Sequence, residues 1–427
     1  MVTKYVAVVL LFAACNKSGS KAPPLADAPK AIDAAVVAID APPPAPAKPH
    51  ATKVVVGVHS SCALMSDATL RCWGANGQGQ LGDGTTTDHP TPVQPALTHV
   101  VDVALGAAHA CAVLDDGSVS CWGEIGFGKS DHIAQPTGVP GINDAKHLFA
   151  VGAASCATMS NGAFVCWGDI DVKGHLRLSG GTREHRVPTP GEGVSHVTQL
   201  TEAGALREDG DVYAWAADGK PRAGALTGIT EIAAAGDSVC GLTKDGDVEC
   251  TGGAPKCAAN APKAPKAPPK PPKAKAKKGK KAPPPPPEPP TAAAVFEKLA
   301  LPKAKHLAFD VGLCVVTTGG LLQCLQSTNA CELDSAWPGL AKIATVDGHC
   351  AQIAEAGVRC WQVDRRSRTT TTVSGISGLQ QMASSSSHGC ALLKNNTVAC
   401  WGENAHGELG RGTADTQSHG EAAPVAL

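Results

Sequence analysis

The sequence predicts an all-β protein, a β-propeller of seven to eight blades built from repeated disulfide-bridged hairpins. Units of roughly 36–49 residues recur along most of the chain, a period typical of propellers. In seven of the eight units, a second cysteine follows the first by ten residues. The chain is also rich in turn-forming residues, with 47 glycines and 33 prolines, and poor in aromatic ones, with 7 Trp, 6 Phe and 2 Tyr. This composition favours short strands joined by turns over helices.

Each unit places one cysteine before a turn and a second cysteine, usually followed by Trp-Gly, after it. The clearest turns carry Asp-Gly or Asn-Gly, a strong hairpin signal. One unit has no cysteine and runs from Gly204 to Trp215. The cysteines of the other seven units form the pairs Cys62 and Cys72, Cys111 and Cys121, Cys156 and Cys166, Cys240 and Cys250, Cys314 and Cys324, Cys350 and Cys360, and Cys390 and Cys400.

The ten-residue spacing also predicts the register of each hairpin. A three-residue loop with a left-handed glycine, such as Asp115-Asp116-Gly117, sets Cys111 opposite Cys121. A two-residue loop would instead set Cys111 opposite Trp122. Because all seven cysteine pairs share one interval, we expect the first register, in which opposed cysteines lie within bridging distance.

Seventeen cysteines indicate an oxidising compartment or a metal. We predict seven hairpin disulfides and an eighth between the two remaining cysteines, Cys257 and Cys331. Histidines do precede several cysteines closely, but structural zinc sites pair short Cys-x₂₋₄-Cys knuckles, which a uniform interval of ten does not match. We therefore expect no metal. The histidines in question are His59, His109, His349 and His388.

Two segments carry a longer motif, Trp-Gly-x-Asn-x-x-Gly-x-Leu-Gly, at Trp73–Gly82 and Trp401–Gly410. Together with Gly-x-x-His-Ser-x-Cys-Ala-Leu, this motif resembles the regulator of chromosome condensation repeat, over about 53–253 and 303–427. The resemblance implies a propeller, typically of seven blades, whereas eight hairpins are present here. The C-terminal segment Ala423–Leu427 resembles Pro92–Leu97, so we expect the C-terminal strand to complete the first blade and close the ring.

The N-terminus is predicted to be a targeting signal over residues 1–14. Lys4 supplies a positive charge, Val6–Phe12 an apolar run and Ala13-Ala14 a small-residue cleavage site. Cys15 then resembles the lipidated cysteine of a bacterial lipobox, although Phe12 departs from the usual aliphatic residue. Plain secretion and an uncleaved start are the alternatives. A lipid anchor followed by an Ala/Pro-rich, disordered tether over 15–51 would place the propeller, 52–427, in the bacterial cell envelope, at the outer membrane on its periplasmic or surface side.

A Lys/Pro-rich insert interrupts the propeller at 254–295. Ten lysines and one acid, Glu288, lie between 254 and 291. No core could hold so many unpaired charges, so we expect a disordered, exposed loop. A weak electrostatic contact with anionic surfaces such as lipopolysaccharide or anionic lipid is the alternative interpretation. Without interleaved aromatic residues, specific nucleic-acid binding is not expected.

Motifs that could carry chemistry have simpler explanations. The segment Gly123–Ser130 fits a P-loop in its letters, but no helical pattern follows it, so no nucleotide site or other cofactor is predicted. The Asp-Gly-Asp segments at Asp209 and Asp245 are explained by hairpin turns rather than by calcium. Arg183–Arg186 is the one polar cluster that breaks the repeat, and an exposed charged loop accounts for it. The repeated tryptophans are expected to pack between blades, and they are Trp73, Trp122, Trp167, Trp215, Trp361 and Trp401.

The sequence therefore favours a protein-binding or scaffold module that presents its blade loops to an unknown protein partner. The loops Asp83–Pro95 and Asp169–Pro190 differ between units, as binding loops on a common scaffold do. The alternative is an envelope enzyme, a lyase or hydrolase with a site in the propeller channel, although no catalytic residue is predicted. The nucleotide exchange activity that the resemblance implies is not expected of an exported protein.

Overall fold

The computed structural model describes most of the predicted propeller. The signal segment, Cys15, the tether up to residue 47, all of the insert, Cys257 and Cys331 lie outside the described residues. Within the described part of the chain, no helix is long and apolar enough to cross a membrane. The described residues are 48–125, 132–168, 185–201, 203–215, 221–223, 226–235, 238–251, 296–309, 313–325, 333–334, 340–354, 357–364 and 367–427.

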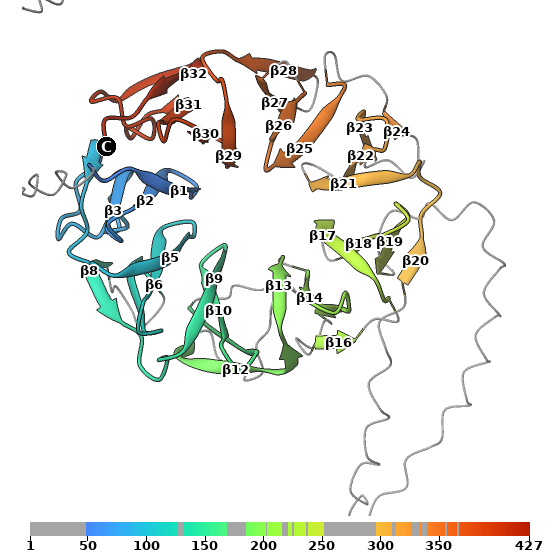
Figure 1. Ribbon diagram of the computed structural model, residues 1–427, viewed down its shortest axis with the longest axis horizontal. Helices are drawn as coiled ribbons and strands as arrows, with labels where there is room; N and C mark the ends of the chain where they lie inside the picture. Colours follow the sequence, from blue (N-terminus) through green and yellow to red (C-terminus); the bar gives the residue numbers. More distant parts are fainter. Residues whose placement is uncertain are drawn as a thin grey trace, which may run out of the picture. The chain divides into compact units, whose positions relative to one another are not determined.

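The unit Lys48–Leu427 consists of eight four-stranded antiparallel sheets, each formed by consecutive strands. Successive sheets contact one another, and the eighth contacts the first, so the sheets are the blades of a closed propeller (Figure 1). The number of blades, which the sequence left at seven or eight, is eight.

Blades 1 to 4 contain the following strands: β1 (Ala51–Val56), β2 (Ser60–Met65), β3 (Leu70–Gly74) and β4 (His89–Val93); β5 (Val100–Leu105), β6 (His109–Leu114), β7 (Val119–Glu124) and β8 (His132–Gly138); β9 (Ala145–Val151), β10 (Ala154–Met159), β11 (Ala163–Gly168) and β12 (His185–Ser195); β13 (Val197–Leu200), β14 (Gly204–Arg207), β15 (Val212–Trp215) and β16 (Pro221–Ala223).

Blades 5 to 8 continue the series: β17 (Ile229–Ala235), β18 (Ser238–Thr243), β19 (Val248–Thr251) and β20 (Phe296–Lys298); β21 (Ala304–Phe309), β22 (Leu313–Thr317), β23 (Leu322–Leu325) and β24 (Leu333–Asp334); β25 (Ile343–Asp347), β26 (Cys350–Ile353), β27 (Gly357–Asp364) and β28 (Ser367–Val373); β29 (Leu379–Ser384), β30 (His388–Leu393), β31 (Val398–Asn404) and β32 (Asp415–Pro424). The first strand of each blade is innermost (Figure 1).

The predicted hairpin register is confirmed. Cys111 lies opposite Cys121 in the ladder between β6 and β7, and Gly117 in their turn has a φ of 80°. All seven hairpin pairs among the described residues are disulfides, with Cα atoms 3.9 to 4.1 Å apart. Blade 4 keeps the same register without a bridge, since Gly204 and Ala214 occupy the two cysteine positions. Strand pairing alone therefore holds a blade together.

The expected closure of the ring by the C-terminal strand is wrong. β32 pairs with β31 in blade 8, where Ala423 lies opposite Cys400. The similar segment after His89 is likewise the outer strand of its own blade, with Val93 opposite Cys72. Each blade is thus completed by its own sequence, and no strand ladder joins blade 8 to blade 1 among the described strands. One backbone hydrogen bond crosses this boundary, from the Gly412 N–H to the Pro90 carbonyl at 2.7 Å. Side chains also close it, in a shared core that includes Ala51, Val54, Trp73, Leu392, Leu409 and Val425.

Every inner strand has a polar residue at or next to a β-bulge, and several of these residues link neighbouring blades. Each innermost strand shifts its register once, at or next to one polar residue. Four polar side chains at these bulges accept a backbone N–H from the inner strand of an adjacent blade, at 2.9 to 3.1 Å. These hydrogen bonds give a partner to backbone N–H groups of the innermost strand, on the edge where no further strand pairs with it. The eight bulge residues are Lys53, Asp102, His147, Gln199, Glu231, His306, Thr345 and Gln381.

Two buried histidines make a second kind of contact between blades. His109 Nε2 lies 2.7 Å from Ser155 Oγ of the next blade, and His388 Nε2 lies 2.8 Å from Ser61 Oγ across the closing boundary. Burial lowers the pKa of His109 to about 4 and that of His388 to about 3. Both imidazoles are therefore neutral near pH 7.

The bulge contact at the ring closure gives the first prediction. Gln381 accepts the Val54 N–H on Oε1 at 3.1 Å and donates from Nε2 to the Val54 carbonyl at 3.0 Å. Gln381→Leu leaves both backbone groups without a partner, so we expect a loss of about 2 kcal/mol or more in the free energy of unfolding, measured with urea. The same change at the exposed neighbour, Gln380→Leu, should cost less than about 0.5 kcal/mol. Equal losses for the two variants would contradict the assigned role.

The buried histidines give the second prediction. The unfolded chain binds a proton on His109 below about pH 6.5, whereas the folded chain does so only near pH 4. Stability should therefore be highest above pH 6.5 and fall by about 3 kcal/mol as the pH drops through this window. His109→Gln, whose amide can still bond Ser155, should reduce that slope by about one proton in urea titrations from pH 7.5 to 4.5. An unchanged slope would show that His109 does not titrate as its burial implies.

Candidate functional site

The repeated Trp-Gly-x-Asn motif builds a turn on the edge of its own blade. In blade 1, Asn76 Oδ1 accepts the Leu81 N–H at 2.9 Å, and Asn76 Nδ2 donates to Asp83 and to Thr85. In blade 8, Asn404 bonds Leu409 and Thr413 in the same way. We call residues 76–82 and 404–410 the covering turns.

Each covering turn packs on the tryptophan of the following blade. Trp122 Nε1 donates to the Gln80 carbonyl at 2.8 Å, and Trp73 Nε1 donates to the Glu408 carbonyl at 2.8 Å. Gly82, with a φ of 73°, approaches so closely that a Cβ would lie 2.8 Å from Trp122 Nε1. These contacts confirm that the tryptophans of the motif pack between blades.

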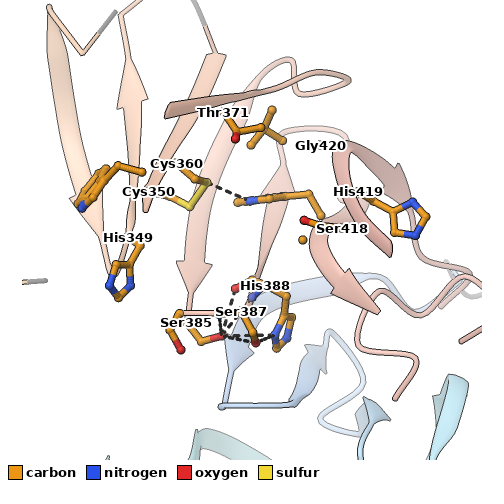
Figure 2. A pocket seen from close by; sticks show the side chains of 15 residues that line it. His349, Cys350, Cys360, Thr371, Ser385, Ser387, His388, Ser418, His419 and Gly420 are labelled. Carbon is orange, nitrogen blue, oxygen red and sulfur yellow. Dashed lines mark hydrogen bonds between the residues drawn. A yellow bond between two sulfur atoms is a disulfide. The ribbon is translucent and has the colours of Figure 1, made fainter. Parts of the chain in front are cut away.

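Blade 7 has no room for a covering turn, because only residues 365–366 separate β27 from β28. The tryptophan of the next blade, Trp401, therefore donates its indole N–H to Cys360 Sγ, at 3.2 Å, instead of to a loop carbonyl. A cleft of about 80 Å³ remains between blades 7 and 8 (Figure 2). It is lined by His349, Cys350, Cys360, Trp361, Thr371, Val373, Ser385, Ser386, Ser387, His388, Trp401, Gly402, Ser418, His419 and Gly420.

The cleft has limited acid–base chemistry. His388 Nδ1 lies 3.1 Å from Ser387 Oγ and 3.3 Å from Ser385 Oγ, and its pKa of about 3 makes the imidazole a weak general base at neutral pH. The other ring nitrogen of His388, Nε2, contacts the Ser61 hydroxyl, and Ser61 is fully buried. Among the described residues that line the cleft, none is a carboxylate. Its volume admits a few waters rather than a metabolite-sized substrate.

The other sequence motifs lie elsewhere. Asp209 pairs with Arg207 at 2.9 Å, and Asp247 pairs with Lys298 and Lys303 at 2.8 Å each. The glycines in these turns have positive φ, as the hairpin interpretation requires. In the described part of the chain, no group of three or more His, Cys, Asp or Glu side chains could hold a metal. Residues 126–130 of the P-loop-like segment and 183–184 of the charged cluster lie outside the described residues.

Sequence reasoning missed the cleft, although a signal was present. Trp361 is followed by Gln-Val-Asp rather than by the Gly-x-Asn that starts a covering turn. A unit that lacks this turn leaves the tryptophan of the next unit without its usual cover.

Comparison with protein families finds two models that match the chain. One, described as the regulator of chromosome condensation (RCC1) repeat, matches residues 70–113, and a second of the same description matches 51–80, 100–128 and 380–408. These segments are RCC1 repeats. They lie in blades 8, 1 and 2, and they include all of the covering turn 76–82 and most of the covering turn 404–410. No curated protein matches the sequence.

Several solved structures resemble the RCC1-like propeller at low sequence identity. Prp20p from Saccharomyces cerevisiae is 16% identical, with 88% of this chain and 76% of that chain covered and a TM-score of 0.40. Human WBSCR16 is 16% identical, with 89% and 83% covered and a TM-score of 0.40. BamB from Moraxella catarrhalis is 12% identical, with 73% and 83% covered and a TM-score of 0.38.

Proposed function

We propose that this RCC1-like propeller is a protein-binding module of the bacterial cell envelope, held there by a lipid on Cys15. The observation that carries the proposal is the distribution of loop lengths over the blades. Antiparallel order puts the connections between first and second strands, and those between third and fourth strands, on one side of every sheet. We call this side the loop face.

Variation in length is concentrated on the loop face. The intervals between third and fourth strands range from residues 365–366 in blade 7 to 252–295 in blade 5. On the opposite face, the turns between second and third strands stay short, as at 66–69 and 160–162. A rigid frame with variable loops on one side is the usual arrangement of binding scaffolds.

The frame beneath these loops is well fixed. Hairpin disulfides, interblade bulge contacts and buried tryptophans hold the strands from which the loops leave. Such pre-organisation lowers the entropy lost when a partner binds. In blade 1, Thr86 and Thr87 are exposed in the loop between β3 and β4 and are open to a partner. The Lys-rich insert also leaves from this face and would add a salt-sensitive attraction to anionic surfaces.

The envelope assignment is supported by the sequence of the first fifteen residues and by the disulfides. Lys4, the apolar run Val6–Phe12 and Ala13-Ala14-Cys15 have the order of a lipoprotein signal. Seven disulfides among the described residues suit an oxidising compartment. A tether then lets the loop face reach a partner at a distance from the membrane.

Loop-face variants test the binding proposal. The native chain should capture a partner from envelope extracts. The double variant Thr86→Arg plus Thr87→Arg should capture at least about tenfold less of it, because two bulky charged side chains block the loop. Ser66→Arg, in the same blade but on the opposite face, is the matched control and should keep capture. Deletion of residues 258–290 should weaken capture at low salt only. If the deletion alone abolishes capture, the binding site is the insert and not the loop face.

The anchor is tested separately. Cys15→Ser should move the protein from the membrane fraction to the soluble fraction and abolish labelling with a fatty-acid probe, because the thiol that carries the lipid is gone. Cys62→Ser, which removes a hairpin sulfur instead, should leave labelling intact. Membrane association that survives Cys15→Ser would refute the lipid anchor.

A further inference from the structure

The disulfide Cys350–Cys360 differs from the other hairpin bridges in its exposure. Cys360 is half-buried, whereas every other described cysteine is at most 8% exposed. The missing covering turn of blade 7 is the cause, since the cleft of about 80 Å³ opens beside this bridge (Figure 2). An attacking thiolate must reach a sulfur, so access decides which bridge exchanges first.

The surroundings of the bridge also favour a sulfur anion. Trp401 Nε1 donates to Cys360 Sγ at 3.2 Å, and a donor to sulfur stabilises the thiolate more than the neutral disulfide. His349 directly precedes Cys350, and its imidazole lines the same cleft. Figure 2 shows His349, the bridge and His388 around one space. In the equivalent positions of blades 1 and 2, the indole N–H is used by a loop carbonyl.

We propose that Cys350–Cys360 is a thiol–disulfide exchange site, which an external dithiol reduces while the other described bridges stay intact. The first thiolate attacks Cys360 Sγ, the sulfur bond breaks, and its electron pair remains on Cys350 Sγ, which takes up a proton. The second thiol of the dithiol loses its proton to water, attacks the mixed disulfide as a thiolate and releases Cys360 as a thiolate beside the Trp401 indole. The bridge gains two electrons, and the dithiol is oxidised to a disulfide.

The fold tolerates this reduction. Blade 4 has the same hairpin register with Gly204 and Ala214 in place of the cysteines, so a blade does not need its bridge. Reduction would therefore change the chemistry of the cleft without unfolding blade 7. The inference depends on the cleft and its contacts, and it holds whether or not the proposed function does.

The site is tested by titrating the folded full chain with dithiothreitol, trapping thiols with iodoacetamide and identifying the labelled cysteines by mass spectrometry. We expect Cys350 and Cys360 to label at a concentration at least about tenfold lower than Cys390 and Cys400, which are fully buried in the adjacent blade. Release of all pairs together, or of Cys350–Cys360 after the others, would overturn the proposal.

A variant pair tests the contribution of the indole N–H. Trp401→Phe keeps an aromatic ring but removes the donor, so the reduced fraction of Cys350–Cys360 in a fixed redox buffer should fall about three- to tenfold. Trp73→Phe removes a donor that bonds the Glu408 carbonyl, and it should leave that fraction unchanged. Equal effects of the two variants would show that Trp401 acts through packing and not through the sulfur.

Discussion

The boundary between adjacent blades is the constraint on which the rest of this structure depends. Backbone hydrogen bonds pair strands within each sheet, and no described strand is shared between blades 8 and 1. The boundaries are therefore held by side chains together with single backbone hydrogen bonds, such as the one from the Gly412 N–H to the Pro90 carbonyl. A polar bulge residue links inner strands at several boundaries, and in the RCC1 repeats a tryptophan packs under the covering turn of the preceding blade. A blade is stable as a hairpin stack, but the ring depends on these contacts.

The same constraint explains why the cleft lies where it does. A covering turn both fills the boundary and accepts the indole N–H, so its loss from blade 7 leaves a space and a donor without its usual acceptor. The sulfur of Cys360 takes the N–H of Trp401 instead. One short loop thus leaves Cys360 of this bridge only partly buried, whereas its partner Cys350 stays buried. Places where a fold departs from its own repeating pattern are often functional sites, and this boundary is such a departure.

The strands of a blade and the connections between its third and fourth strands differ in how much their sequence and length can vary. The inner strands and hairpins repeat closely, since each must match two neighbours. The connections between third and fourth strands also contact neighbouring blades, as the Gly84 N–H does with the Ala134 carbonyl, but their lengths differ widely, from residues 365–366 to 252–295. Change can therefore accumulate on the loop face without loss of the fold, which is why the proposed partner site is placed there.

The sequence by itself determined the hairpins, because their signals are local: a ten-residue interval and a left-handed glycine such as Gly117 decide the register of Cys111 and Cys121. It also supplied eight units, which became eight blades. It did not decide which blade the C-terminal strand completes, since Ala423–Leu427 resembles Pro92–Leu97 wherever either strand pairs. That choice, and the cleft beside Cys360, arise from contacts between residues distant in the chain, such as Trp73 with Glu408, and only the tertiary structure brings these together.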